Sequence, residues 1–161
     1  MAKKPIQFQL NGESKAVFAD DGRNLLDVLR RGVGDLSPKY GCGQGSCGSC
    51  TVLIDGEPYL ACLTLAETVE GHTIETTGGM DAGGEVHPLQ EAFMRNFAAQ
   101  CGYCTPGMLM AAKALLNKNP RPSREEILSA LEGNLCRCTG YEPIINAILE
   151  VAQGGASQSY G

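Results

Sequence analysis

The chain has 161 residues, a formal net charge of −5 and eight cysteines. This length suits one ordinary domain or two small ones. The sequence contains no basic block and no interleaving of basic with aromatic residues. These patterns are typical of nucleic-acid and anionic-membrane binding, so the sequence argues against both functions.

The first half of the chain is predicted to be an α+β unit with two hairpins and one short helix. Alternating apolar residues over 5–19 flank an Asn11-Gly12 turn, which predicts the first hairpin. Asn24 suits the N-cap of a short apolar helix. A glycine-rich loop then covers 32–49. Asp55-Gly56 predicts a second hairpin between strands at 51–54 and 58–60, and a last strand is predicted at 73–76.

The second half is predicted to be helical. Pro88 suits the first position of a helix, and Thr105 suits an N-cap before a first-turn proline. Ser123 and Glu126 fit a capping box, and Pro143 begins the last helix. Four short antiparallel helices predict a four-helix bundle.

These elements divide the chain into segments. We expect one domain over 1–76 and a helical domain over 87–153, joined by a glycine-rich linker at 77–86. The tail at 154–161 is expected to be disordered. The N-terminus lacks the apolar core of a secretory signal, and no apolar run is long enough to span a bilayer. We expect a cytoplasmic protein without direct membrane insertion, although a partner's signal could export a folded complex.

The eight cysteines form two groups of four, and none is left over. The first group follows C-x4-C-x2-C with a more distant fourth thiol, which is the plant-type ferredoxin spacing for a [2Fe–2S] cluster. Glycines in the 41–50 loop allow backbone N–H groups to approach the sulfur atoms. The expected ligands of the first cluster are Cys42, Cys47, Cys50 and Cys62.

The second group pairs a C-x2-C with a distant C-x-C. Two such pairs at facing helix ends could hold one cluster, so we favour a second [2Fe–2S] site. The pair at 101–104 is by itself also typical of a thioredoxin-like motif, and zinc is the alternative for the whole group. Disulfides are disfavoured by the crowding of Cys47 and Cys50 and by the lack of a secretory signal. The expected ligands are Cys101, Cys104, Cys136 and Cys138.

Three motifs in order resemble the small iron–sulfur subunit, or the matching N-terminal region, of the molybdenum hydroxylase family. That family includes xanthine dehydrogenase, aldehyde oxidoreductase and aerobic carbon monoxide dehydrogenase. The motifs are GCGQGSCGSCTV at 41–52, QCGYCTPGM at 100–108 and GNLCRCTGY at 133–141. The resemblance implies a β-grasp, plant-ferredoxin-like domain for the first cluster and a four-helix domain for the second.

The resemblance also implies an electron-transfer subunit of a multi-subunit molybdenum oxidoreductase, with no substrate-converting residue of its own. A large subunit would hold molybdopterin, in its cytosine dinucleotide form. Electrons would pass through the second and then the first cluster to FAD in a medium subunit or to another acceptor. Gln100 and Cys138 match the family positions that contact molybdopterin. The implied complex is heteromeric, such as a dimer of heterotrimers.

The remaining chemical side chains are interpreted as structural. His72 and His87 flank the linker as solvated or boundary residues, and Tyr103 and Tyr141 are expected to shield a cluster from water. The alternative function is a free ferredoxin-like shuttle or redox sensor. A shuttle needs only the first group of cysteines, so the second group favours a fixed partner.

Overall fold

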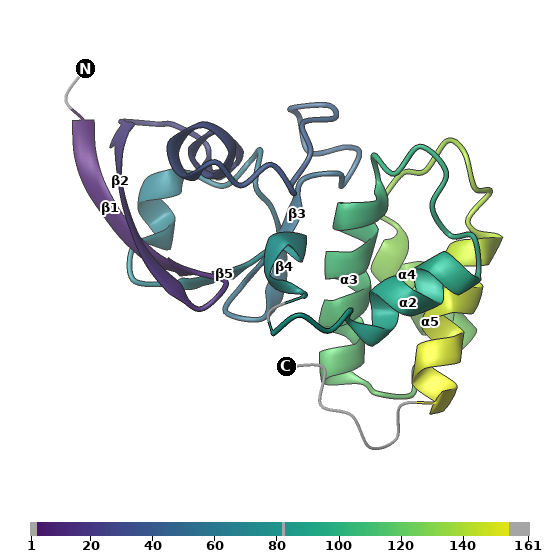
Figure 1. Ribbon diagram of the computed structural model, residues 1–161. Coiled ribbons are helices and arrows are strands. Elements are labelled where there is room, and N and C mark those ends of the chain that lie inside the picture. Colours follow the sequence, from purple (N-terminus) through teal and green to yellow (C-terminus); the bar gives the residue numbers. More distant parts are fainter. Residues whose placement is uncertain (1–2, 82, 155–161) are drawn as a thin grey trace.

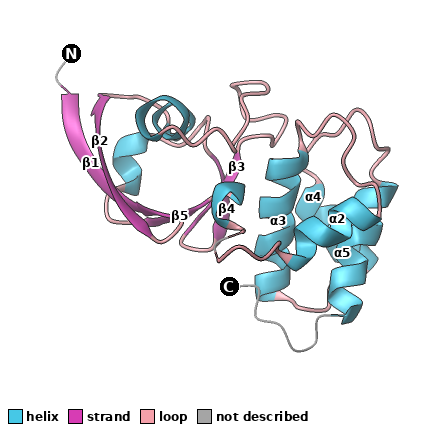
Figure 2. Ribbon diagram, viewed as in Figure 1, coloured by secondary structure: helices cyan, strands magenta, loops and turns pink. Residues whose placement is uncertain are grey.

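The computed structural model describes residues 3–81 and 83–154 (Figure 1). The chain forms a sheet-containing half and a helical half that lie side by side (Figure 2). Of the tail predicted to be disordered, Gly154 belongs to the last helix and 155–161 lie outside the described residues. No helix in the described ranges is long and apolar enough to cross a bilayer.

The N-terminal half contains a mixed five-stranded sheet in the order β2-β1-β5-β3-β4. The strands are β1 (Lys3–Leu10), β2 (Glu13–Asp20), β3 (Thr51–Ile54), β4 (Glu57–Leu60) and β5 (Thr73–Glu75). Strands β1 and β5 are parallel, and the other neighbours are antiparallel. Both predicted hairpins are confirmed, because left-handed Asn11-Gly12 and Asp55-Gly56 turns connect their strands.

A helical segment packs its apolar side chains against the sheet. The helical segments of this half are α1 (Leu25–Asp27), the π-helix η1 (Val28–Val33) and the 3₁₀ helices η2 (Ala66–Val69) and η3 (Thr77–Gly79). Asn24 caps α1 as predicted, since its Oδ1 accepts a hydrogen bond from the N–H of Asp27 at 2.8 Å. Leu29 and Phe8 belong to the same buried core.

Four helices form the C-terminal half around a second apolar core. They are α2 (Pro88–Arg95), α3 (Thr105–Lys118), α4 (Arg124–Leu131) and α5 (Glu142–Gly154). Helix α2 begins at Pro88 as predicted, and the predicted capping box of α4 is present at Ser123 and Glu126. Helix α5 begins at Glu142, one residue before Pro143. The fully buried core residues include Leu89, Met108, Leu116, Ile127, Ile144 and Ile148.

The start of α3 corrects one prediction. Thr105 is the first residue of the helix, and Cys104 is its N-cap. Cys104 already has right-handed helical backbone angles, φ −81° and ψ −17°, so the first turn includes Thr105. Thr105 is therefore not the cap, and its hydroxyl is not used for capping.

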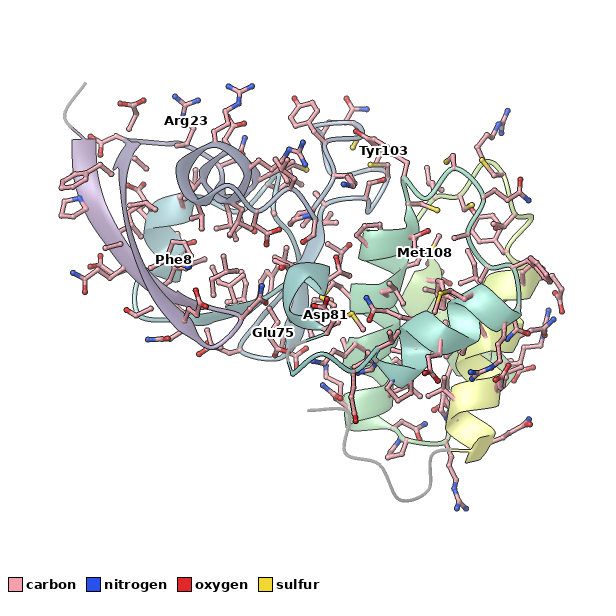
Figure 3. All side chains as sticks on the ribbon, viewed as in Figure 1. Phe8, Arg23, Glu75, Asp81, Tyr103 and Met108 are labelled. Atoms are coloured by element: carbon pink, nitrogen blue, oxygen red, sulfur yellow. The ribbon has the colours of Figure 1, made fainter. Side chains whose placement is uncertain are left out.

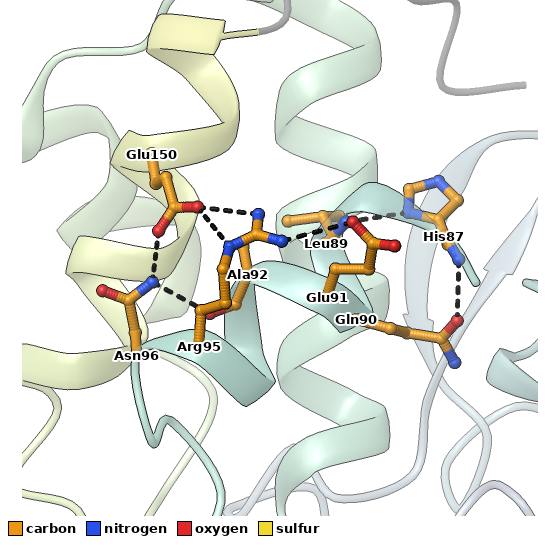
Figure 4. Close-up of polar contacts among 8 residues, drawn as sticks. All are labelled: His87, Leu89, Gln90, Glu91, Ala92, Arg95, Asn96 and Glu150. Carbon is orange, nitrogen blue, oxygen red and sulfur yellow. Dashed lines mark hydrogen bonds and ion pairs between the residues drawn. The ribbon is translucent and has the colours of Figure 1, made fainter.

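Helix α2 is fixed at both ends by polar side chains (Figure 4). At its start, His87 Nδ1 accepts a hydrogen bond from the N–H of Leu89 at 3.1 Å, and Gln90 completes a capping box. At its end, Arg95 and Asn96 both donate hydrogen bonds to the carboxylate of Glu150 in α5. His87 is thus a buried boundary residue, whereas His72 is exposed.

The two halves share apolar side chains. Leu53 of β3 is fully buried within the core of the helical half. Met80, which follows η3, is buried in the same core. Helix α3 packs against β3 and β4. The segment at 77–86 therefore connects two halves that are in direct contact.

Candidate metal centres

The cysteines lie in loops and at helix ends. Figure 3 shows several sulfur atoms among the loops near Tyr103. None of the eight cysteines forms a disulfide, and their exposure differs. The buried ones are Cys50, Cys62 and Cys136; Cys42, Cys47 and Cys104 are partly buried; Cys101 and Cys138 are exposed.

The loop after η1 directs backbone N–H groups at the sulfur of Cys42. The N–H groups of Gln44 and Ser46 lie 3.5 Å and 3.3 Å from Cys42 Sγ. Gly43 and Gly45 are left-handed, a conformation that brings the backbone close to the sulfur. The pKa of Cys42 is lowered to about 5. The largest cause is the hydrogen bond from the Gln44 backbone, followed by those from Ser46 and from the thiol of Cys47. Thiolate, the form that binds metals, is therefore favoured here.

The other two thiols of the first group form a second pair. Burial is the main cause that raises the pKa of Cys50 to about 12, and the thiol of Cys62 adds to it. Cys62 follows the end of β4, and the N–H of Ala61 donates to the Cys50 carbonyl at 3.3 Å. Cys42 thus interacts with the thiol of Cys47, and Cys50 interacts mainly with that of Cys62 and less with that of Cys47, so the first group is arranged mainly as two pairs.

The second group is also arranged as two pairs. The sulfur atoms of Cys101 and Cys138 are 3.6 Å apart. Cys104 pairs with Cys136, and burial followed by this thiol contact raises the pKa of Cys104 to about 12. Burial acts to raise the pKa of Cys136, but hydrogen bonds from the hydroxyl and N–H of Thr139, at 3.1 Å and 3.5 Å, outweigh it and lower the pKa.

This paired arrangement fits a binuclear cluster. A [2Fe–2S] cluster held by four cysteines has two irons, each bound by two thiolates. Two pairs of sulfur atoms in each group match that requirement. Within the described ranges, no group of three or more His, Cys, Asp or Glu side chains converges as the ligands of one metal ion. The N–H and hydroxyl donors at Cys42 and Cys136 suit sulfur atoms that carry negative charge.

The two cysteine loops touch each other directly. Asn134 Nδ2 donates a hydrogen bond to the carbonyl oxygen of Gly48 at 3.0 Å, and the N–H of Leu135 donates to the carbonyl of Cys47 at 2.9 Å. A Cβ atom on Gly107 would lie 2.2 Å from the Gly48 oxygen, so the backbones approach as closely as glycine permits. The distance between the two groups is therefore fixed by protein contacts.

The two residues expected to face molybdopterin lie at the surface. Cys138 and Gln100 are both exposed. Gln100 directly precedes Cys101, whose sulfur contacts that of Cys138. The two tyrosines beside the cysteines form hydrogen bonds. The Tyr103 hydroxyl donates to the carbonyl of Tyr40 at 2.7 Å, and the Tyr141 hydroxyl accepts from the N–H of Cys136 at 3.0 Å.

Sequence reasoning missed two residues of these centres. Thr139 donates to a sulfur atom, and its position directly after the C-x-C pair was the available signal. Asn134 joins the two loops across 86 residues, and no local pattern indicates that contact.

Two family models together match most of the chain. The model described as 2Fe-2S iron-sulfur cluster binding domain matches residues 8–75. The model described as [2Fe-2S] binding domain matches residues 68–149. The first range contains the four cysteines of the first group, and the second contains those of the second group.

Individual relatives extend this match along the chain. The nicotinate dehydrogenase small FeS subunit of Eubacterium barkeri is 47% identical over 148 residues, which cover 92% of this chain and 94% of that protein. Aldehyde oxidoreductase of Megalodesulfovibrio gigas is 41% identical over 146 residues, which cover 89% of this chain and 16% of that protein.

A solved structure gives the same result for the fold. Quinoline 2-oxidoreductase from Pseudomonas putida 86 matches with a TM-score of 0.90 and 47% identity, and the match covers 95% of this chain and 98% of that chain. The mixed α/β architecture with its five-stranded sheet is therefore the [2Fe–2S] ferredoxin-like fold extended by helices. The chain carries two [2Fe–2S] clusters and transfers electrons within an oxidoreductase. It belongs to the small iron–sulfur subunits of the molybdenum hydroxylase family.

Proposed function

We propose that this chain carries electrons from molybdopterin in a large partner subunit to FAD in a medium subunit, or to another acceptor. The observation that supports this most strongly is the direct contact between two cysteine groups, each made of two thiol pairs. When bound, a [2Fe–2S] cluster supplies the redox chemistry, while the protein sets its position and potential.

The proposed ligands divide between the two halves. The first cluster is held by Cys42, Cys47, Cys50 and Cys62 of the sheet-containing half. The second cluster is held by Cys101, Cys104, Cys136 and Cys138 of the helical half. Their arrangement in pairs supports this assignment over a single zinc ion, which needs four ligands around one point.

We assign the contact with molybdopterin to the exposed site of the second group. Gln100 is exposed and directly precedes Cys101 in the chain, and Cys138 is an exposed thiol that pairs with Cys101. An exposed amide and an exposed ligand together allow close approach by a cofactor in another subunit. The first group lies beyond the Gly48–Asn134 contact, so electrons that enter at the second group leave through the first group to the acceptor.

The finer architecture and assembly are part of the same proposal. The sheet-containing half is a β-grasp domain, and helices α2–α5 form a four-helix bundle domain. The chain spans 16% of the aldehyde oxidoreductase that it resembles, which supports a separate large subunit. We propose a medium FAD-binding subunit as well, a dimer of heterotrimers as the complete complex, and a cytoplasmic location, where disulfides are rare and clustered cysteines usually bind metals.

Metal analysis of the purified chain tests the cluster assignment. Two binuclear clusters require about four irons and about four acid-labile sulfides per chain, with two distinct paramagnetic signals on reduction. Zinc without visible absorbance would contradict the assignment. Purification from the native source tests the partner: we expect a molybdopterin-containing large subunit to co-purify, whereas a stable free monomer would favour a ferredoxin-like shuttle.

A further inference from the structure

Thr105, the first residue of α3, has a hydroxyl that pairs with none of the described residues. Its Oγ1 is buried from solvent and has no hydrogen-bond partner among the described residues. Burial of a hydroxyl without a partner is costly, and native proteins rarely tolerate it. This atom therefore indicates a partner that is not among the described residues of this chain.

The position of Thr105 in α3 excludes the two common uses of a threonine hydroxyl. Cys104 is the N-cap, so the Thr105 hydroxyl does not cap the helix. Thr105 is also the first residue of the helix, so no preceding helical turn offers a carbonyl as an acceptor. The same chain gives other threonine hydroxyls clear acceptors: Thr51 donates to the carbonyl of Gly48 at 2.7 Å.

A proposed cluster ligand is the residue next to Thr105 in the chain. Thr105 directly follows Cys104, whose thiol pairs with that of Cys136, but its hydroxyl donates to neither of these sulfur atoms in the structure. On this same pair, the hydroxyl of Thr139 already lies 3.1 Å from Cys136 Sγ, which shows that a threonine hydroxyl here can donate to sulfur. Cys104 is partly buried, and the Thr105 hydroxyl itself is shielded from water.

We propose that the Thr105 hydroxyl donates a hydrogen bond to a sulfur atom of the second cluster and thereby raises the reduction potential of that cluster. Thr105 acts as a tuning residue and not as a ligand. The inference rests on the assignment of Cys104 and Cys136 as ligands. A donor stabilises the reduced cluster more than the oxidised cluster, because reduction adds negative charge to the sulfur atoms.

A redox titration of the assembled complex, followed by electron paramagnetic resonance, tests this proposal. We expect Thr105→Val to shift the midpoint potential of the second cluster to a lower value and leave the first cluster unchanged. Thr105→Ser keeps the hydroxyl and should stay close to the wild-type potential. Thr139→Val, which removes a donor seen in the structure, should shift the second cluster in the same direction. Wild-type potentials for both clusters in Thr105→Val would overturn the proposal.

A variant that does not retain the second cluster also gives an answer. If Thr105→Val loses it while Thr105→Ser keeps it, and the first cluster's signal persists in both, the hydroxyl is required and the proposal is supported. If the serine variant loses the cluster as well, the methyl group is the essential part and the proposal is wrong. A wild-type complex with only one paramagnetic signal would instead overturn the ligand assignment itself.

Discussion

Lys113 of α3 and Glu75 of β5 form an ion pair between the two halves, with Lys113 Nζ 2.8 Å from Glu75 Oε2. The lysine side chain is only 7% exposed, whereas the glutamate is 33% exposed. A buried ammonium group is costly unless a carboxylate accompanies it. The pair therefore holds α3 against the sheet and helps to fix the position of the second cysteine group relative to the first.

Glu75→Gln should destabilise the protein by about 2–3 kcal/mol, because it leaves the Lys113 ammonium group buried without an opposite charge. Urea unfolding measures this change. The control is Glu57→Gln, which removes the partner of Lys118 in an exposed ion pair. That variant should change the free energy of unfolding by less than about 1 kcal/mol. Equal effects of the two variants would show that burial of Lys113 does not matter.

Gly48→Ala should disrupt the contact between the cysteine loops. A Cβ atom at Gly48 would lie 2.3 Å from the Gly133 carbonyl oxygen and 2.6 Å from Asn134 Nδ2. We expect about 1–2 kcal/mol from the left-handed backbone and about 1–3 kcal/mol more from the steric conflict.

Gly56→Ala is the matched control for this variant. Gly56 has a similar φ of +83°, but a Cβ there would meet no described atom within 4 Å. Gly56→Ala should therefore lower the free energy of unfolding only by the amount due to the left-handed backbone. Urea unfolding with the visible absorbance of both clusters as the signal measures each variant, and equal stability of the two would contradict the close-contact interpretation.

Single serine substitutions should remove one cluster at a time. Cys138→Ser should abolish the second paramagnetic signal and turnover by the complex while the first signal remains, because an alcohol is a poor replacement for a thiolate ligand of iron. Cys42→Ser should have the reciprocal effect on the first signal. Turnover with the natural acceptor in Cys138→Ser would contradict the proposed electron path.

Glu150 should contribute to acid sensitivity. Hydrogen bonds from Asn96, and then from Arg95, lower the pKa of Glu150 below its usual value (Figure 4). Because the pKa is lower in the folded than in the unfolded state, the stabilisation is complete above the unfolded pKa and is lost as the pH falls through the folded pKa. Glu150→Gln should thus be less stable than wild type near neutral pH, and the difference should shrink in acid. The urea midpoints of both proteins, measured from neutral pH into acid, report this difference in stability. A difference that does not change with pH would contradict the role of the Glu150 carboxylate.

Features that depend on residues close together in the chain could be predicted from the sequence. Asn11-Gly12 and Asp55-Gly56 marked both hairpins, because these residues tolerate the left-handed conformation that the turns require. The spacing of the cysteines likewise indicated two separate sites of four thiols each. The capping box at Ser123 is a third local signal that is confirmed.

The features that could not be predicted depend on long-range packing. The contact of Asn134 with Gly48 joins residues 86 positions apart, and neither residue type indicates its partner. The start of α3 was placed wrongly because Thr105 is a good N-cap by residue type, but Cys104 occupies that position in the structure. No sequence pattern indicates that the hydroxyl of Thr105 lies buried without a hydrogen-bond partner among the described residues.

The burial of Leu53 limits how this protein can be divided. Leu53 is supplied by the sheet but is covered by helices, together with Met80 from the connecting segment. Cleavage within the glycine-rich segment, followed by separation of the fragments, would expose Leu53 on one fragment and open a cavity in the other. We therefore expect neither half to behave as an interchangeable module. The chain should unfold as one cooperative unit, so unfolding of either half destabilises the other.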